Sequence, residues 1–260
     1  MLLSVPHSGR EYDPALIARS RLGRASLERL EDPLVDRLTA GAIALGAGAI
    51  IARAPRAMVD CNRAEKELDP IAIAGRTGEA PTARARAGLG LIPTRLAEIG
   101  DLWRGPISES ALATLLADVH RPFHAALDAE LEVLSQKWTD VVLIDCHSMP
   151  PRPPGEADIV IGDRHGTSSA PWATLAATGV AERLGFKVAR NVPFAGGHIV
   201  ERHGAPSRGR HAIQIEVDRS RYCLRDACSP GPGFERVSHL FDELARELGE
   251  LAAGRSPDAA

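Results

Sequence analysis

An apolar run at residues 142–144 ends abruptly at Asp145, and His147 follows two positions later. A short run of branched apolar residues predicts a buried β-strand, and the acid and histidine after it predict polar groups carried to the edge of a sheet. In open α/β folds, ligands bind outside the carboxyl ends of the strands. This run therefore predicts an α/β protein with a polar site at that edge.

Three other strand-like runs end in the same way, at His7, Asp60 and Glu216. The carboxyl ends of parallel strands lie along one edge of a sheet, so we expect these side chains to contribute to a single site. Two histidines and several acids at one edge indicate a catalytic or metal-binding function.

Strand-like and helix-like segments alternate along the chain, which predicts a mostly parallel sheet covered by helices on both faces. Helical periodicity predicts helices over residues 25–45 and 109–136, the second kinked or broken at Pro122. Residues 65–105 are rich in Pro, Gly and Arg and predict a long functional or mobile loop. A glycine-containing loop is also predicted at residues 194–204.

The chain has 260 residues, of which 44% are hydrophobic, enough for the core of one α/β domain. No segment has the composition of a linker, so residues 1–251 are predicted to form a single domain and residues 252–260 a disordered tail. The net charge of −3 gives no reason to expect nucleic acid or a membrane surface as partner.

The N-terminal residues have no basic region and no long apolar run, so no signal peptide is predicted and we expect a cytoplasmic protein. Cysteines in that compartment are expected to be reduced. A disulfide between Cys223 and Cys228 is the less favoured alternative. The other two cysteines are Cys61 and Cys146.

His7 and His147 are the leading candidates for metal ligands, although either could be a hydrogen-bonded loop residue. Imidazole nitrogens together with a carboxylate suit zinc, and a catalytic zinc ion keeps three protein ligands and one open position. Four acids qualify by type as the carboxylate ligand. Asp145 has an equally plausible role as the acceptor that orients a ligand. The four acids are Asp32, Asp36, Asp60 and Asp145.

Glu216 is predicted to be the general base that takes a proton from the attacking water. The alternative is an ion pair with Arg219 or Arg221. Asn62 and Arg63 place an amide beside a guanidinium, which suits a substrate carboxylate or an oxyanion. The alternative for Arg63 is a surface residue at a helix C-terminus.

Four further histidines carry weaker signals. His120 and His124 are four residues apart on a predicted helix, but Pro122 intervenes and no glutamate follows His120, so a metal-binding pair is not favoured. His165 and His198 follow glycine turns that lack a phosphate-binding spacing. His198 is predicted to line the substrate pocket, and a loop hydrogen bond is the alternative for both.

Six motifs, in this order, resemble the N-formylglutamate amidohydrolase family, and they run from near the N-terminus to Glu216. They are Val5-Pro6-His7-Ser8-Gly9, Val59-Asp60-Cys61-Asn62-Arg63, Arg121-Pro122-Phe123-His124, Asp145-Cys146-His147-Ser148-Met149, Asn191-Val192-Pro193-Phe194-Ala195-Gly196-Gly197-His198 and Ala212-Ile213-Gln214-Ile215-Glu216.

The resemblance implies a zinc-dependent hydrolase with a three-layer α/β/α fold of the phosphorylase/hydrolase-like type, similar to zinc carboxypeptidases and aspartoacylases. It implies that His7, Asp32 and His147 bind one zinc ion. Glu216 matches the general base, and the Asn62-Arg63 pair looks like the pair that grips the substrate carboxylate in aspartoacylases.

The function predicted from these residues is metal-dependent hydrolysis of the linear amide bond of a small N-acyl, carboxylate-bearing substrate such as N-formylglutamate. Glu216 and Arg63 are the predicted catalytic residues. A carboxypeptidase-like peptidase or amidase is the first alternative, because the segment at residues 65–105 could admit a larger substrate. A metal-free small-molecule binding protein on the same scaffold is the second.

Overall fold

The fold was examined in a computed structural model, which describes residues 1–76, 80–224 and 229–255. The chain divides into two compact units, each assembled from separate segments. We call the first the sheet unit; it comprises Met1–Val5, Asp32–Ile51 and Ala126–Ala260. We call the second the loop unit; it comprises Pro6–Glu31 and Ala52–Ala125.

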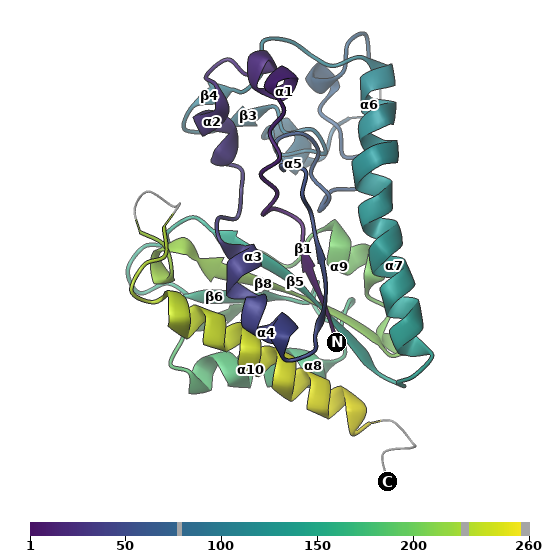
Figure 1. The fold of residues 1–260 in the computed structure, drawn as a ribbon, viewed down its shortest axis with the longest axis vertical. Helices are drawn as coiled ribbons and strands as arrows, with labels where there is room; N and C mark the ends of the chain where they lie inside the picture. The colour runs from purple at the N-terminus through teal and green to yellow at the C-terminus, as the bar shows by residue number, and fades with distance from the viewer. Residues whose placement is uncertain (77–79, 225–228, 256–260) are drawn as a thin grey trace. The chain divides into compact units, whose positions relative to one another are not determined.

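The sheet unit is built on six strands in the order β2-β1-β5-β8-β6-β7 (Figure 1). Strand β6 is antiparallel to β8, and every other pair of neighbours is parallel, which confirms the predicted mostly parallel sheet. The strands are β1 (Leu2–Val5), β2 (Gly48–Ile51), β5 (Val141–Met149), β6 (Ile159–Gly162), β7 (Val188–Arg190) and β8 (Arg210–Asp218).

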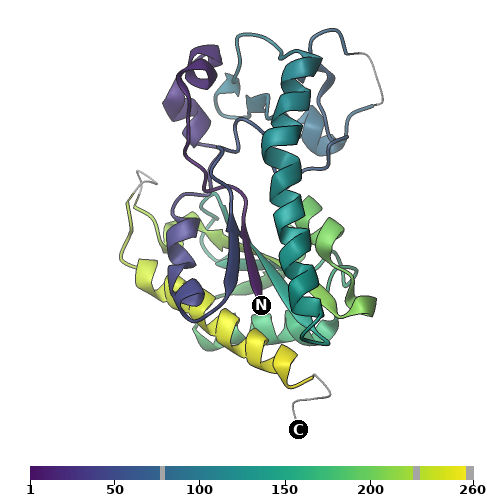
Figure 2. The same ribbon diagram turned by 45° about the vertical axis from the view of Figure 1, so that its right-hand side comes forward.

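One face of this sheet is apolar and carries the main core. Alternate residues of β5, such as Ile144 and Cys146, join alternate residues of β8, such as Ile213 and Ile215, in one buried cluster. Helix α10 lies along this face in both ribbon views (Figures 1 and 2) and adds Leu240 and its neighbours to the cluster. The helices that contribute to the cluster are α3 (Val35–Leu38), α4 (Ala40–Ala44), α8 (Pro171–Arg183) and α10 (Phe234–Ala253).

The opposite face carries the polar residues of the central strands. Asp145 and His147 point there, because side chains alternate between the faces of a strand and Ile144 and Cys146 are in the core. Helix α9 (His198–His203) contacts β5 and β8, and its Arg202 Nη2 donates to Asp128 Oδ2 of α7 at 3.1 Å. Helices on both faces confirm the predicted α/β/α class.

The loop unit contains short elements around two apolar clusters. Ile73, Leu91 and Leu112 belong to one cluster, and Leu27 and Leu102 belong to the other. Its elements are α1 (Pro14–Arg19), α2 (Arg24–Glu28), η1 (Pro70–Ala72), α5 (Ala83–Arg86), β3 (Arg95–Leu96), β4 (Gly100–Asp101), α6 (Glu109–Leu115), the π-helical turn η2 (Leu116–His120) and the start of α7 (Arg121–Ser135). The predicted irregular segment at residues 65–105 thus holds short elements and part of two cores.

Two predictions in the first quarter of the chain were wrong. The helix predicted over residues 25–45 is three short helices, because Pro33 disfavours helical backbone at Asp32 and Leu34 adopts a left-handed φ of 62°. The strand predicted before Asp60 is a turn, in which the Met58 backbone N–H donates to Pro55 O at 2.9 Å.

The helix predicted over residues 109–136 is continuous through Pro122, which lies in α7; its irregularity is the π-helical turn η2, which ends two residues before Pro122. The predicted loop at residues 194–204 instead contains α9. Residues 252–253 end α10, and residues 256–260 lie outside the described part of the chain, as does Cys228 of the Cys223–Cys228 pair. The remaining 3₁₀ turns are η3 (Pro206–Arg208) and η4 (Arg219–Arg221).

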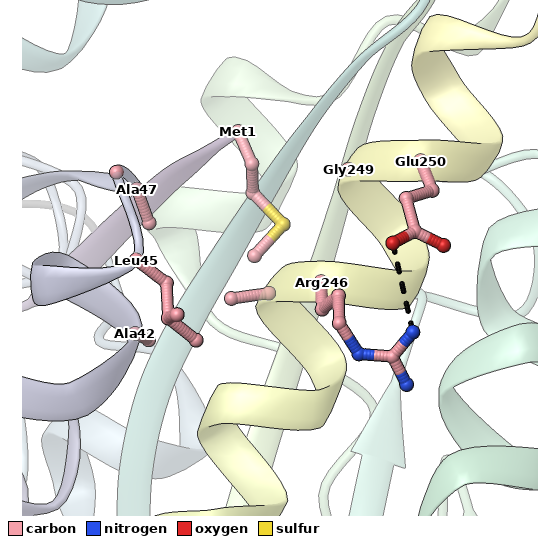
Figure 3. A pocket seen from close by; sticks show the side chains of 9 residues that line it. Met1, Ala42, Leu45, Ala47, Arg246, Gly249 and Glu250 are labelled. Carbon is pink, nitrogen blue, oxygen red and sulfur yellow. Dashed lines mark ion pairs between the residues drawn. The ribbon is translucent and has the colours of Figure 1, made fainter.

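A cavity of about 290 Å³ lies beside the amino ends of β1 and β2 (Figure 3). Met1 and Leu45 line it, and its charged groups, Arg246 Nη1 and Glu250 Oε1, pair at 3.5 Å. It is therefore not the site predicted at the carboxyl ends of the strands. Within the described ranges of the chain, none of the helices combines the length and the apolar character needed to cross a membrane.

Candidate active site

Two rows of polar residues cross the centre of the sheet. In the first row, Asp145 of β5 is aligned with Ser4 of β1 on one side and with Gln214 of β8 on the other. In the second row, His147 of β5 is aligned with Glu216 of β8. Residues aligned on neighbouring parallel strands project from the same face, so the register alone assembles this polar cluster in the sheet unit.

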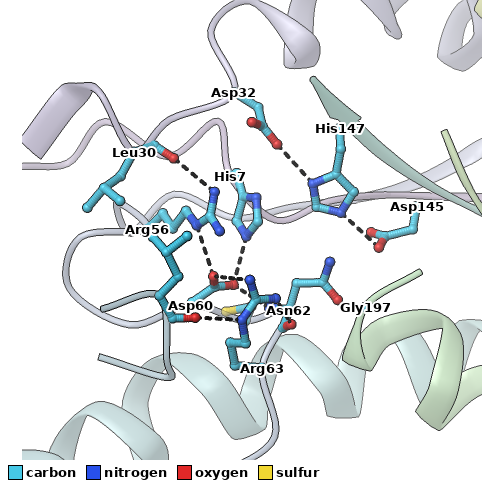
Figure 4. A network of polar contacts seen from close by, with 12 residues as sticks. His7, Leu30, Asp32, Arg56, Asp60, Asn62, Arg63, Asp145, His147 and Gly197 are labelled. Carbon is cyan, nitrogen blue, oxygen red and sulfur yellow. Dashed lines mark hydrogen bonds and ion pairs between the residues drawn. The ribbon is translucent and has the colours of Figure 1, made fainter. Parts of the chain in front are cut away.

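His147 is held between two buried carboxylates (Figure 4). Its Nε2 lies 2.8 Å from Asp145 Oδ2, and its Nδ1 lies 2.9 Å from Asp32 Oδ2. Ser4 Oγ donates to the other oxygen of Asp145 at 3.0 Å, which fixes that carboxylate in turn. A carboxylate on the far nitrogen of an imidazole is the arrangement that orients metal-bound histidines.

The carboxylates of Asp32 and Asp145 place negative charge in a buried environment. Burial alone lowers the pKa of His147, but Asp145 and Asp32 outweigh it, so the pKa of this ring lies well above its ordinary value. Buried carboxylates need a compensating positive charge. A proton on His147 would supply it, and so would a metal cation beside Asp32 and the facing ring nitrogen. The donor set thus fits a divalent cation.

Asp32 is fixed by contacts to its second oxygen. Arg219 Nη2 donates to Asp32 Oδ1 at 3.1 Å, and Ser148 Oγ lies 3.4 Å from the same oxygen. The Tyr222 hydroxyl donates to the carbonyl oxygen of Pro33 at 2.8 Å, which anchors the next residue of the chain. Asp36, an alternative ligand by type, lies in the first turn of α3.

Glu216 is held by a neighbour on its own strand. Gln214 Nε2 donates to Glu216 Oε1 at 2.9 Å, and Gln214 Oε1 accepts from the backbone N–H of Gly197 at 2.8 Å. Gly197 caps α9, which begins at His198, and the side chain of His198 is 15% exposed. The last of the weaker candidates, His165, lies in an exposed loop with a φ of 58°.

In the loop unit, His7 has a partner of the same kind as His147. His7 Nε2 lies 2.7 Å from Asp60 Oδ1, and Arg56 Nε donates to Asp60 Oδ2 at 2.9 Å (Figure 4). Asp60 is fully buried; burial opposes its ionisation, but Arg56, His7 and Arg63 hold the pKa of this carboxyl well below its usual range. Asp60 is thus an ionised acceptor that orients the His7 ring.

Arg63 is buried and held in one orientation. Its Nε donates to Leu89 O at 2.8 Å, and its Nη1 donates to Asn62 O at 2.6 Å. Burial lowers the pKa of Arg63, while the nearby Asp60 opposes that change. Two histidines hold the turn that carries Asn62 and Arg63: His120 Nε2 lies 2.8 Å from Arg63 O, and His124 Nε2 lies 2.9 Å from Cys61 O.

Of the predicted site residues, the sheet unit brings together Asp32, His147 and Asp145, with Glu216 aligned beside His147. The loop unit brings together His7, Asp60, Asn62 and Arg63. The buried residues His7, Asp32 and His147 offer the two imidazoles and one carboxylate of a His/Asp/His group that could hold a metal ion.

Sequence reasoning missed three supporting residues: Arg56, Gln214 and Arg219. Gln214 carried a usable signal, because it lies two positions before Glu216 and therefore shares its face of β8. Arg219 was considered only as an ion-pair partner of Glu216, and its pairing with Asp32 was not foreseen. Nothing in the spacing around Arg56 distinguishes it from other arginines.

Comparison with known proteins identifies the family. The family model described as N-formylglutamate amidohydrolase matches residues 1–223. N-formylglutamate deformylase from Pseudomonas putida is 29% identical over 230 residues, which cover 85% of this chain and 81% of the relative. The enzyme of the same name from Pseudomonas aeruginosa is 29% identical over 265 residues, covering 98% and 94% respectively.

Solved structures agree with this result. The crystal structure of N-formylglutamate amidohydrolase from Ralstonia eutropha JMP134 superposes with a TM-score of 0.89 at 27% identity, covering 96% of this chain and 93% of that one. A gene product of Agrobacterium tumefaciens shares the fold, with a TM-score of 0.62 at 18% identity over 96% of this chain and 89% of its own. The chain therefore belongs to the N-formylglutamate amidohydrolase family, whose named members are hydrolases that act on an amide bond.

Proposed function

We propose that this protein is a metal-dependent amidohydrolase that removes the formyl group from an N-formyl amino acid such as N-formylglutamate. The names of its relatives support the substrate class. The observation that carries the proposal is His147, held between Asp32 and Asp145 with Glu216 aligned on the next strand. An imidazole, a carboxylate and a nearby acid are the groups that such a hydrolysis requires.

We assign His7, Asp32 and His147 as the ligands of one zinc ion. Chain connectivity supports the inclusion of His7, because it follows the last residue of β1 by two positions and consecutive Cα atoms are about 3.8 Å apart. Strand β1, which ends two positions before His7, pairs with β5, the strand that presents His147. These three residues would hold the ion, and the chemistry that zinc would supply when bound is that of a Lewis acid, which lowers the pKa of water toward about 7 and polarises a carbonyl oxygen.

Each remaining role belongs to a residue of the chain. Glu216 takes a proton from the water as its oxygen bonds to the formyl carbon, and it returns that proton to the nitrogen as the C–N bond breaks. Arg63 donates to the oxyanion that forms on the formyl oxygen. Asn62 and Arg63 bind the carboxylate of the substrate, and His198 lines the pocket. Formate and the free amino acid are the products.

The proposal is tested with the purified, zinc-loaded protein and a panel of N-formyl-L-glutamate, N-acetyl-L-glutamate and short peptides. We expect release of formate from the first compound and slower turnover of the others. Glu216→Gln should keep its zinc and lose at least about a hundredfold in kcat. Glu130→Gln, at an exposed acid of α7, is the control and should retain the parental rate. Parental turnover by Glu216→Gln, or no formate from any N-formyl amino acid, contradicts the assignment.

A further inference from the structure

Gln214 is hydrogen-bonded at both ends of its amide group. It is 4% exposed, and it lies on the same face of β8 as Glu216. Its Oε1 accepts from the backbone N–H of Gly197 at 2.8 Å, and its Nε2 donates to Glu216 Oε1 at 2.9 Å. The amide therefore links the start of α9 to the carboxylate that we assign as the general base.

The orientation of this amide is determined by its partners. A backbone N–H can only donate, so the atom that faces Gly197 must be the oxygen of the Gln214 amide. The NH₂ group then faces Glu216, where an ionised carboxylate can only accept. The pairing is thus specific to a glutamine in this orientation, and a buried amide satisfied at both ends has little freedom to turn.

We propose that Gln214 is a positioning residue, which aims the carboxylate of Glu216 and couples its orientation to the Gly197 turn before α9. The proposal rests on the role of Glu216 as general base. Positioning matters because a general base must lie within hydrogen-bond reach of the proton that it takes, and a displacement of about 1 Å can reduce the rate about a hundredfold.

A purely structural role for Gln214 is the competing explanation, and two variants separate the two roles. Gln214→Glu keeps an oxygen for the Gly197 N–H but replaces the donor to Glu216 with a second carboxylate. Gln214→Met keeps the length of the side chain but removes both hydrogen bonds. The matched control is Ser168→Ala, which removes a buried hydrogen bond of 2.8 Å to Ala212 O on the same strand.

We expect kcat to fall on the order of 10- to 100-fold in both Gln214 variants, with KM within about twofold of the parental value and full zinc content. Ser168→Ala should lower the melting temperature with little change in kcat. If Gln214→Met does not fold, Gln214→Glu alone decides, because its bond to Gly197 is preserved. A parental kcat in Gln214→Glu overturns the proposal.

A double-mutant cycle with Glu216→Gln is the decisive measurement. If Gln214 acts through Glu216, then Gln214→Met in the Glu216→Gln background should reduce the residual kcat by less than about threefold. An equal fold loss in both backgrounds overturns the proposal. The test also separates the two hypotheses: failure of the base assignment appears as parental activity in Glu216→Gln itself, whatever the Gln214 variants do.

Discussion

His147 and Asp145, two residues apart on β5, are joined by a contact of 2.8 Å between Nε2 and Oδ2. The loop unit contains a second histidine–aspartate pair of this kind, in which His7 Nε2 lies 2.7 Å from Asp60 Oδ1. In each pair, a buried carboxylate binds Nε2 of the ring. Both proposed histidine ligands are thus oriented by an aspartate that does not itself need to touch the metal.

Asp145→Asn should weaken zinc binding about 10- to 100-fold, because an amide is a poorer acceptor for the ring of His147 and no longer fixes its orientation. The measurement is a competition titration of the apoprotein with zinc and a chelator of known affinity. Asp163→Asn is the matched control, since Asp163 is another largely buried aspartate of the sheet unit, hydrogen-bonded to Asn191 and Thr174. It should lose stability but bind zinc like the parent; equal affinities for the Asp145 variant and the parent contradict the orienting role.

Arg219→Met should lower zinc affinity by about tenfold, because Asp32 loses the guanidinium that holds its second oxygen at 3.1 Å. The same titration measures the effect. Arg221→Met provides the comparison, since Arg221 is a neighbouring arginine that pairs with Asp158 at 2.7 Å. If both variants bind zinc as the parent does, Arg219 does not position Asp32.

Much of the sheet unit was predictable because a buried strand can be recognised from a short apolar run in the sequence. In the run before Asp145, the side chains that point to either face of the strand are apolar, and the run ends at polar residues. This is the pattern expected of a central strand in a sheet covered on both faces. The cluster around His147 follows from that strand and its register with β8. Sequence reasoning therefore found Asp145, His147 and Glu216 together.

The rest depended on contacts between distant segments. Asp60 was expected at a strand end, but it follows a turn, and the Asp60 backbone N–H donates to Leu91 O at 2.8 Å. His120 and His124 showed only a helical spacing, and their role in holding the 61–63 turn depends on residues 57 and 63 positions away. Local periodicity contains no information about such pairs.

Arg63→Lys should raise KM for N-formylglutamate at least about tenfold and also lower kcat. A lysine cannot keep the two bonds to Leu89 O and Asn62 O while it presents a planar fork to a carboxylate. Steady-state kinetics test this, with Arg121→Lys as the control, because Arg121 is an exposed arginine of the same unit that pairs with Glu65. Unchanged kinetics in Arg63→Lys remove this residue from the site.

Glu31→Gln should stabilise the protein at neutral and alkaline pH. Burial raises the pKa of Glu31 to about 6, although the hydrogen bond from Tyr12 and the charge of Arg10 oppose the shift. A folded-state pKa above the unfolded one means that the folded protein holds the proton more tightly. Stability therefore falls as pH rises from about 4.5 to about 6, by at most about 2 kcal/mol.

The variant removes this ionisation, and glutamine still accepts from Tyr12. Its free energy of unfolding, relative to the parent, should increase by up to about 2 kcal/mol between about pH 4 and about pH 8. Denaturant titrations at the two pH values give this difference. Glu98→Gln, at an exposed glutamate that pairs with Arg29, should show no such trend. If the free energy of unfolding depends on pH in the same way in the parent and in Glu31→Gln, the raised pKa of Glu31 is not the source of that dependence.

The central claim is that His7, Asp32 and His147 bind one zinc ion. Anomalous diffraction at the zinc edge, on crystals of protein purified with zinc, tests it most directly. We predict one strong peak bonded to these three residues, and no such peak in crystals of His147→Ala grown in the same way. A peak bonded to other residues, or no peak in the parental protein, contradicts the account.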